Sequence, residues 1–237
     1  MIGKREDQRM QKNNRRSWRL HLAATKDQFK APEVSLGPWA SYSMVHDPKH
    51  LCFVLARYKF CSKMLEGKKR VLEIGCGDGL GAPIVAGAVG HLHCLDWEPR
   101  NIKGNARRCS FLKNVTYEYL DASRQVINGT YDACFHIDVL EHLDPRDEKA
   151  LMANTCQALT EDGVLIIGTP NKTAARYATK RSSSQHINLK TSEALRCLME
   201  KYFKNCFMFS MNDEVVHTGY APMAHYLFAI GVGKRTQ

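Results

Sequence analysis

A glycine-rich turn between two strand-like segments constrains the fold of this chain more than any other feature. The turn spans Gly75 to Gly79 and follows segment 71–74, and a second apolar segment, 92–95, ends at Asp96. This order of strand, glycine turn, helix and strand ending in an acid is typical of the nucleotide-binding half of a doubly wound α/β fold. The sequence therefore predicts that the turn binds a ligand of nucleotide type.

The spacing of the glycines argues against a dinucleotide. A dinucleotide site has the pattern Gly-x-Gly-x-x-Gly, which would put its third glycine at position 80. Here position 80 is Leu80, the glycines stand at 75, 77 and 79, and Glu73 precedes the first of them by two residues. A carboxylate at that place repels a pyrophosphate. It suits a cationic ligand such as S-adenosylmethionine, which carries an amine and a sulfonium.

The turn resembles motif I of the class I S-adenosylmethionine-dependent methyltransferases, and five motifs in order extend the resemblance over roughly residues 47–231. The resemblance implies that Asp96 binds both ribose hydroxyls, that Trp97 packs on the adenine and that Asp121 lies near the adenine amino group. The subgroup most similar in pattern contains quinone-biosynthesis O-methyltransferases and bacterial sugar and small-molecule methyltransferases. Its members share the Glu-His pair found here at 141–142 and the Thr-Pro-Asn at 169–171.

The resemblance also implies which residues surround the cofactor. They come from the glycine turn, from the ends of the second and fourth strands, from the loop after the third strand and from the helix before motif I, which often contacts the methionine carboxylate in this family. The expected cofactor-binding residues are Glu73, Gly75, Cys76, Gly77, Gly79, Asp96, Trp97, Asp121, Ala122, Asp138 and Arg57.

Strand-like and helical segments alternate from residue 70 onward. Such alternation requires parallel strand pairing with helices on both faces of the sheet. The last two apolar segments have no long helix between them, so we expect an antiparallel hairpin at one edge. The prediction is an α/β fold with a doubly wound, mostly parallel seven-stranded sheet, Rossmann-like as in the resembling methyltransferases. The expected strands are 70–75, 91–96, 114–120, 131–138, 163–169, 205–211 and 223–231, and the expected helices are 79–88, 99–109, 145–160 and 191–203.

The residues before the glycine turn divide into two parts. Asp47 and Pro48 start a helix, because an acid at the N-cap and a proline in the first turn are favourable start signals. Residues 31–46 contain two prolines and a glycine and are expected to form a loop. We therefore expect residues 1–46 to be a basic N-terminal extension that can act as a lid, and residues 47–237 to be the methyltransferase domain.

The positive charge of the chain is unevenly distributed. Residues 1–30 contain nine Lys or Arg and three acids, so they contribute +6 of the total of +10. Such a segment can contact RNA or another polyanion, contact a membrane surface, or remain solvated. No apolar run approaches the roughly 20 residues of a membrane-spanning helix, and the charged N-terminus lacks the apolar core of a secretory signal. Nine cysteines without a Cys-x-x-Cys pair indicate reduced thiols and a cytoplasmic location.

Three residues after the fourth expected strand are candidates for the chemistry. They are Asp138, Glu141 and His142, and ligands of doubly wound sheets bind at this edge. His142 is one candidate for the general base, since its ordinary pKa lies near neutrality. The resemblance to metal-assisted quinone O-methyltransferases instead implies a divalent metal ion that lowers the pKa of a substrate hydroxyl. A purely structural role for the three residues stays open.

A long polar segment, 171–190, follows the fifth expected strand. Segments of this kind are usually lids or binding loops. His186 lies in it, at a place where the resembling families often carry a histidine, and is a second candidate for a catalytic role. The segment is basic, which suits an anionic substrate group or a solvated loop. Its basic residues are Lys172, Arg176, Lys180 and Arg181.

A second polar segment, 210–220, separates the last two expected strands. It is longer than the two to five residues of a plain hairpin turn, so we expect a loop on the substrate side of the sheet. The candidate substrate-binding residues are Asn171, Asp213, Glu214 and His217.

These features favour an O-methyltransferase that acts on a small molecule or a saccharide. Amine-methylating relatives carry an Asp/Asn-Pro-Pro-aromatic motif after the fourth strand, whereas residues 137–140 are Ile-Asp-Val-Leu. Two alternatives stay open. One is a methyltransferase of RNA or another polyanion that uses the basic N-terminus, and the other is a cofactor-binding partner subunit without catalysis. The sequence does not indicate an oligomeric state.

Overall fold

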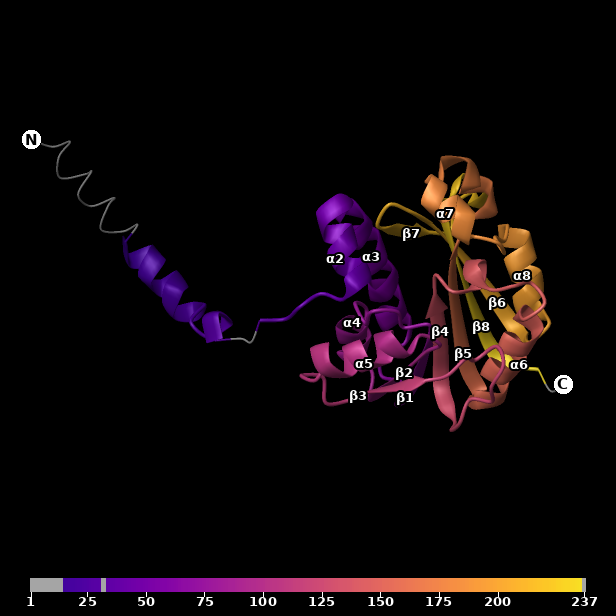
Figure 1. Cartoon of the computed structure of the whole chain (residues 1–237), viewed down its shortest axis with the longest axis horizontal. Helices are drawn as coiled ribbons and strands as arrows, with labels where there is room; N and C mark the ends of the chain where they lie inside the picture. Colours follow the sequence, from indigo (N-terminus) through magenta and orange to yellow (C-terminus); the bar gives the residue numbers. More distant parts are fainter. Residues whose placement is uncertain (1–14, 31–32, 236–237) are drawn as a thin grey trace, which may run out of the picture. The chain divides into compact units, whose positions relative to one another are not determined.

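The computed structural model describes residues 15–30 and 33–235 of the chain (Figure 1). The chain divides into two compact units, residues 1–35 and residues 36–237. Within the described residues, no helix combines the length and the hydrophobicity that crossing a bilayer requires.

The described part of the first unit is basic and largely exposed. Residues 15–24 are helical, and the short 3₁₀-helix η1 (Gln28–Lys30) follows them. Trp18 and Leu20 are exposed on this helix. The first 14 of the 46 residues of the expected basic extension lie outside the described residues.

The second unit is built around one mixed sheet of eight strands in the order β3-β2-β1-β4-β5-β8-β6-β7. The first five of these strands run parallel, while β8 pairs antiparallel with both β5 and β6. Because β1 and β4 are neighbours, the chain reverses its progress across the sheet between them, which defines the topological switch point. The strands are β1 (Arg70–Ile74), β2 (His91–Asp96), β3 (Val115–Tyr119), β4 (Tyr131–Ile137), β5 (Leu159–Pro170), β6 (Phe203–Asn212), β7 (Val215–His217) and β8 (Tyr226–Lys234).

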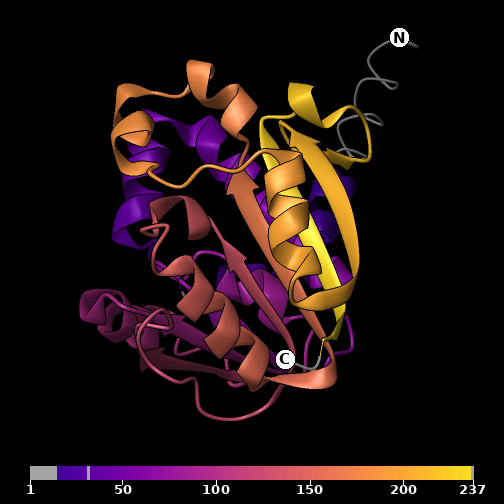
Figure 2. The ribbon, with the colours of Figure 1, turned by 90° about the vertical axis from the view of Figure 1, so that its right-hand side faces the viewer.

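Helices cover both faces of this sheet (Figure 2). On one face, α6 and α8 contribute Leu151, Met152 and Leu195 to the core, and on the other face α3 and α4 contribute Tyr58 and Val85. The strands between them are buried on both sides, as expected of parallel strands. The helices are α2 (Pro38–His46), α3 (Pro48–Met64), α4 (Ala82–Ala86), α5 (Pro99–Arg108), α6 (Glu148–Ala158), α7 (Lys180–Gln185) and α8 (Ser192–Glu200), with the 3₁₀-helices η2 (Leu140–His142), η3 (Lys172–Tyr177) and η4 (Ala221–Met223).

The predicted α/β fold is confirmed, including the parallel order of the first five strands and the antiparallel C-terminal hairpin. Two local expectations were wrong. Residues 38–46 form α2 and not a loop, because Pro38 stands at the first helical turn, where its missing N–H has no consequence. Segment 210–220 is not one long loop, because Asp213 adopts a φ of 50° and allows a tight turn into an eighth strand, β7.

His136 is a buried residue of β4 whose burial destabilises the folded state. Neither ring nitrogen has a hydrogen-bond partner among the described residues. Burial lowers the pKa of His136 to about 4, from about 6.5 in an unfolded chain. The folded state therefore binds fewer protons than the unfolded state between these two pH values. Stability is lost as the pH falls through this window.

We expect His136→Leu to raise the free energy of unfolding. The substitution removes two unpaired polar atoms and keeps an apolar side chain of similar volume, so the gain is about 1 to 3 kcal/mol. It also removes the proton uptake, so the difference between the two proteins grows on acidification. Denaturant unfolding at pH 7 and pH 5 measures both effects, and a variant less stable than the parent at pH 5 contradicts this expectation.

Candidate active site

The candidate site lies at the carboxyl ends of β1 and β4, at the switch point of the sheet (Figure 1). The loops after β1, β2, β4 and β5 all leave the sheet at this edge, because these strands are parallel. Ligands of doubly wound sheets bind in the crevice outside these strand ends. Most of the residues expected from the sequence to bind the cofactor or carry the chemistry belong to these loops.

The glycine turn after β1 has a backbone that only glycine adopts easily. Gly75, Gly77 and Gly79 have φ values of 76°, 52° and 75°. A Cβ on Gly75 would collide with the side chain of Val139, so the turn lies directly against the loop after β4. A Cβ on Gly77 would meet no atom within 4 Å. The open space over Gly77 fits a ligand that approaches the backbone closely.

The carboxylate of Asp96 joins this turn to the end of β2. Its Oδ2 accepts the N–H of Gly77 at 2.8 Å, and its Oδ1 accepts the N–H of Glu98 at 2.8 Å. Burial raises the pKa of Asp96. Trp97, the next residue, is 68% exposed, which leaves its ring available to a flat ligand. This placement fits the expected ribose and adenine contacts of S-adenosylmethionine.

Two further residues that the resemblance assigns to the adenine follow β3. The Oδ1 of Asp121 accepts the N–H of Ser123 at 3.0 Å and its hydroxyl at 2.6 Å. Oδ2 of Asp121 lies 3.4 Å from Nε of Arg124, and Ala122 is buried. Contacts of Asp121 and Ala122 with the adenine stay a prediction.

Glu73 and Cys76 lie in the interior, next to the turn. Glu73 is 1% exposed, and its Oε2 accepts the thiol of Cys94 at 3.3 Å. Burial raises the pKa of Glu73 to about 7. Cys76 is also buried and accepts the side-chain amide of Asn105 at 3.6 Å. Both side chains thus support the turn from inside, and direct contact of Glu73 with the amine of the cofactor stays a prediction.

Helix α2 is tied to the glycine turn by a hydrogen bond. Oδ2 of Asp78, a buried residue of the turn, accepts the N–H of Ala40 at 2.8 Å. A Cβ on Gly37 would overlap the carboxylate of Asp78, so the start of α2 packs closely on the turn. No pattern in the sequence indicates this contact. The expected lid role of the segment before α3 stays a prediction, but α2 has a fixed point at the cofactor turn.

We expect Asp78→Ala to loosen α2. A hydrogen bond to a charged acceptor contributes about 1.5 to 3 kcal/mol, so the amide of Ala40 would exchange with solvent roughly 10- to 100-fold faster. Hydrogen exchange followed by NMR measures this, and the amides of α8 provide an internal control. Unchanged exchange at Ala40 would contradict the assignment.

Asp138 and Arg57 form an ion pair beside the turn. The Nη1 of Arg57 donates to Oδ2 of Asp138 at 2.6 Å, and the guanidinium lies 3.9 Å from the ring centre of Tyr226. Asp138 has a φ of 57°, which is strained for a residue with a side chain. Arg57 thus already has an acidic partner inside the protein. Its contact with the carboxylate of the cofactor stays a prediction.

Glu141 organises the loop after β4. It is 1% exposed, and its Oε2 accepts the hydroxyl of Thr169 at 3.1 Å, while Oε1 is buried and has no partner in the described part of the chain. Burial, and next the charge of Asp138, raises the pKa of Glu141 well above its usual range. The backbone oxygen of Glu141 accepts the N–H groups of Ile187 and Asn188 at 2.8 and 3.0 Å. These two bonds bring the 186–188 segment to the end of β4.

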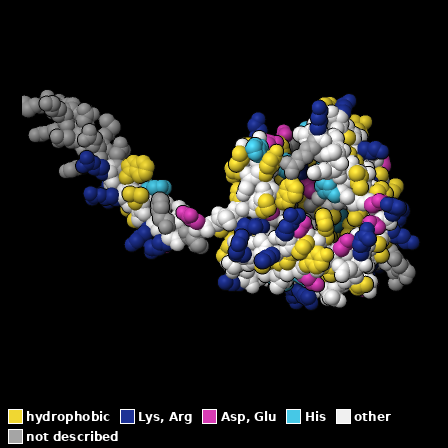
Figure 3. All heavy atoms as spheres, viewed as in Figure 1, with side chains coloured by type: hydrophobic (Ala, Val, Ile, Leu, Met, Phe, Trp, Pro, Cys, Tyr) yellow, Lys and Arg dark blue, Asp and Glu magenta, His cyan; other side chains and the backbone are white. Residues whose placement is uncertain are grey.

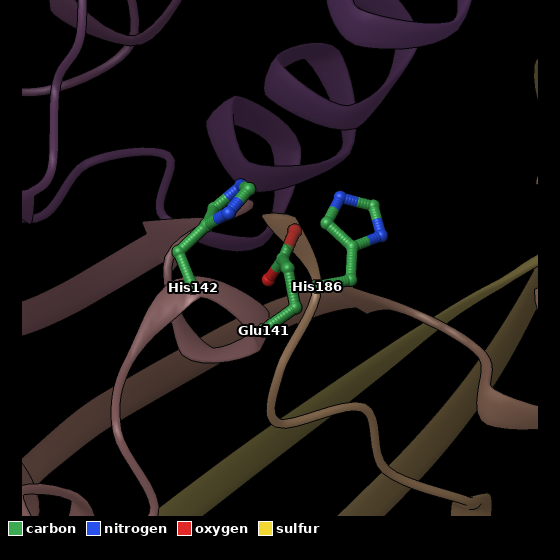
Figure 4. A group of neighbouring side chains, drawn as sticks. All are labelled: Glu141, His142 and His186. Atoms are coloured by element: carbon green, nitrogen blue, oxygen red, sulfur yellow. The ribbon is translucent and has the colours of Figure 1, made fainter. Parts of the chain in front are cut away.

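His142 and His186 meet at this point. Their ring centres are 5.0 Å apart, and Figure 4 shows the carboxylate of Glu141 between the two rings, with all three side chains directed into the same space. Ligand atoms of the three residues lie within 4.8 Å of one another. Burial, and next the nearby His142, lowers the pKa of His186. Among the described residues, the side chains placed to hold a metal ion together are therefore Glu141, His142 and His186. The expected set included Asp138, but Oδ2 of Asp138 is bound to Arg57.

The four candidate substrate residues have different surroundings. Asn171 is 1% exposed and uses its amide within the protein. Both ring nitrogens of His217 are bonded inside the hairpin, to Asn212 and to the N–H of Gly219. Asp213 and Glu214 are exposed at the β6–β7 turn. Asn171 and His217 thus act on the local structure, and substrate contacts of Asp213 and Glu214 stay a prediction.

Three residues of the site were not singled out as site residues. Thr169, known from the sequence only as part of a family pattern, binds Glu141, while Tyr226 packs on Arg57 and Asp78 holds α2. Tyr226 looks like an ordinary core residue of a terminal strand. Only the pairing of β5 with β8, which puts Tyr226 beside Pro170, reveals its position at the site.

The comparison with protein families agrees with this geometry. A family model described as a methyltransferase domain matches residues 45–202. The chain belongs to this methyltransferase domain family, and its fold and glycine turn are those of the class I S-adenosylmethionine-dependent methyltransferases. S-adenosylmethionine is therefore the cofactor, and its binding over the glycine turn stays a prediction.

Curated relatives cover part of the chain. A protein of Methylocella silvestris named ubiquinone biosynthesis O-methyltransferase is 32% identical over 137 residues, which are 56% of this chain and 52% of the relative. A protein of the same name from Xanthomonas campestris pv. campestris is 29% identical over 122 residues, half of each chain. The chain thus spans about half the length of the curated relatives it matches.

Solved structures share the fold at low identity. The methyltransferase domain of bacterial CtHen1-C has a TM-score of 0.64 and 16% identity, covering 76% of this chain and 99% of that domain. The N-methyltransferase NodS from Bradyrhizobium japonicum WM9 has a TM-score of 0.57 and 18% identity, covering 80% of this chain and 99% of NodS. At these identities the likeness shows the fold alone.

Proposed function

We propose that this protein transfers the methyl group of S-adenosylmethionine to a hydroxyl of a small molecule or a saccharide. The observation that carries the proposal is the group of Glu141, His142 and His186 at the strand ends. Glu141 and His142 belong to the loop after β4, which packs on the glycine turn, and His186 follows α7. The relatives named ubiquinone biosynthesis O-methyltransferase support oxygen as the acceptor atom. Methyl transfer is an in-line displacement that needs alignment at about 3 Å and removal of a hydroxyl proton.

His142 is suited to remove that proton. Its Nδ1 lies 3.1 Å from the backbone oxygen of Gln185, which can only accept a hydrogen bond. Nδ1 therefore carries the hydrogen, and the lone pair is on Nε2. His186 has a lowered pKa and stays neutral at pH 7, so the two imidazoles do not repel each other there.

The same three residues also fit a divalent metal ion. Oε1 of Glu141 is a buried carboxylate oxygen without a partner among the described residues. One carboxylate and two imidazoles form a ligand set used for Zn²⁺ and other transition metals. A bound ion supplies Lewis acidity, which lowers the pKa of a hydroxyl that it contacts. We propose Glu141, His142 and His186 as the residues that hold it, with Asp138 kept apart by Arg57.

Transfer of labelled methyl groups into a cell extract tests the proposal. We expect label from S-adenosylmethionine in the small-molecule or glycan fraction. Chelation separates the two roles of His142, because a metal-dependent enzyme loses activity and regains it with Zn²⁺ or Mn²⁺, whereas a metal-free base does not. Label confined to protein would contradict the proposal.

The same experiment tests the two alternatives. Label in RNA that disappears when residues 1–30 are removed would support a polyanion methyltransferase with a basic binding segment. On the visible face of the second unit, Lys and Arg side chains are spread out with acidic side chains among them (Figure 3). Binding of S-adenosylmethionine in calorimetry without label in any fraction would support a non-catalytic partner subunit.

A further inference from the structure

A cavity of about 350 Å³ lies between η3 and η4, beside the ends of β6 and β8. Asn171 joins its two walls. The Nδ2 of Asn171 donates to the backbone oxygens of Ala221 and Ala224 at 2.8 and 2.9 Å, and its Oδ1 accepts the N–H of Thr173 at 3.2 Å. A fully buried amide that makes three bonds fixes both walls. The cavity is therefore a built feature of the fold.

The cavity adjoins the candidate active site. Thr169, which binds the carboxylate of Glu141, precedes Asn171 by two residues on the same extended segment. In an extended chain, residues two positions apart are separated by about 7 Å, and their side chains point to the same side. The wall that Asn171 holds is therefore close to the residue that binds Glu141.

The cavity is lined by basic side chains and by no acidic side chain. None of its nine lining residues is Asp or Glu, while Arg176 and His225 are among them. The guanidinium of Arg176 lies 4.7 Å from the ring centre of Tyr177, and no described residue forms a salt bridge with Arg176. Met223, Pro222 and Ala224 supply apolar surface on the opposite wall. This combination favours a ligand with an anionic group and an apolar body.

We propose that this cavity binds the anionic group, a carboxylate or a phosphate, of the methyl acceptor. The proposal rests on the proposed function and adds a substrate class to it. Arg176 supplies the charge, because a guanidinium binds the oxygens of both anions through paired N–H groups. Asn212 is held by His217 and by the backbone of Met223, and it keeps one amide N–H for the same ligand.

Titration of the whole protein, labelled with ¹³C on its methionine methyl groups, tests the proposal. The probes are inorganic phosphate, benzoate and, as the uncharged counterpart of benzoate, benzamide. We expect a saturable shift of the Met223 signal, assigned with Met223→Leu, for at least one of the two anions. Phosphate alone would identify a phosphorylated acceptor, and benzoate alone a carboxylate. An equal response to benzamide, or no saturable response to either anion, would overturn the proposal.

Two variants connect the response to the cavity. We expect Arg176→Gln to weaken anion binding about tenfold or more, because it removes charge-assisted hydrogen bonds. Lys172→Gln removes one positive charge from the same 3₁₀-helix, outside the lining, and is expected to change the affinity less than about twofold. Equal losses in both variants would mean attraction by a basic segment, and no cavity site.

A titration with S-adenosylmethionine in the same samples separates this proposal from the proposed function. We expect Arg176→Gln to bind the cofactor as the parent protein does. Anion binding without cofactor binding would contradict the methyltransferase proposal and leave the anion site standing. Cofactor binding without anion binding would contradict only the anion site.

Discussion

We expect Asp96→Ala to lose S-adenosylmethionine affinity by about 100-fold or more. Asp96 accepts the N–H groups of Gly77 and Glu98, so it fixes the glycine turn, and its carboxylate is also the expected partner of the ribose hydroxyls. Hydrogen bonds to a charged group contribute about 1.5 to 3 kcal/mol each, and two of them account for this loss. Isothermal titration calorimetry of the folded variant measures the affinity.

The matched control is Asp132→Ala. The carboxylate of Asp132 also accepts two backbone N–H groups, those of Lys69 and Arg70, but it lies at the opposite end of β1. The control variant loses the same kind of interaction and should bind the cofactor within about twofold of the parent protein. Equal losses in both variants would show that the effect comes from general destabilisation of the sheet.

The second large effect is expected for Glu141→Gln. This change keeps the shape of a side chain that is almost fully buried but replaces its carboxyl group, between the two imidazoles of His142 and His186, by an amide that does not exchange a proton. Loss of a group that takes part in proton removal or metal binding slows the reaction by about 10²- to 10⁴-fold. We expect this loss in the rate of label transfer, with cofactor affinity within about twofold of the parent, because Glu141 belongs to the loop after β4 and not to the glycine turn.

Glu118→Gln is the control for this variant. Glu118 also lies beside a histidine, 3.1 Å from Nε2 of His93, but at the β2–β3 side of the sheet. It should leave the rate of transfer unchanged. A Glu141→Gln protein that transfers label at the parental rate would remove Glu141 from the chemistry and leave His142 and His186 as the remaining candidates.

The sequence predicts the central part of the fold well because the glycine turn and the parallel strands are local patterns. Gly75, Gly77 and Gly79 need positive φ values that other residues avoid, and the apolar runs of β2 and β4 are buried on both faces. The same patterns predict the edge of the sheet where Asp96, Glu141 and His142 gather. These residues follow strand ends directly, so the topology alone determines their neighbourhood.

The remaining features depend on contacts between distant residues. Arg57 and Asp138 are 81 residues apart, and their pairing decides that Asp138 does not join the two histidines. Glu141 binds the backbone at 187–188, which brings His186 into the group. The β6–β7 hairpin depends on the positive φ of Asp213, a conformation that Asp tolerates but does not require. Spacing along the chain carries no information on any of these three contacts.

The position of β8 has a consequence for synthesis of the protein. β8 lies between β5 and β6, yet it is made after both of them, and its residues 226–230 are buried. A nascent chain without β8 exposes the open edges of β5 and β6, and such unpaired edges promote aggregation. β8 also brings Tyr226 to Arg57. A ribosome-bound chain therefore cannot complete either its sheet or its candidate active site before residue 230 has emerged.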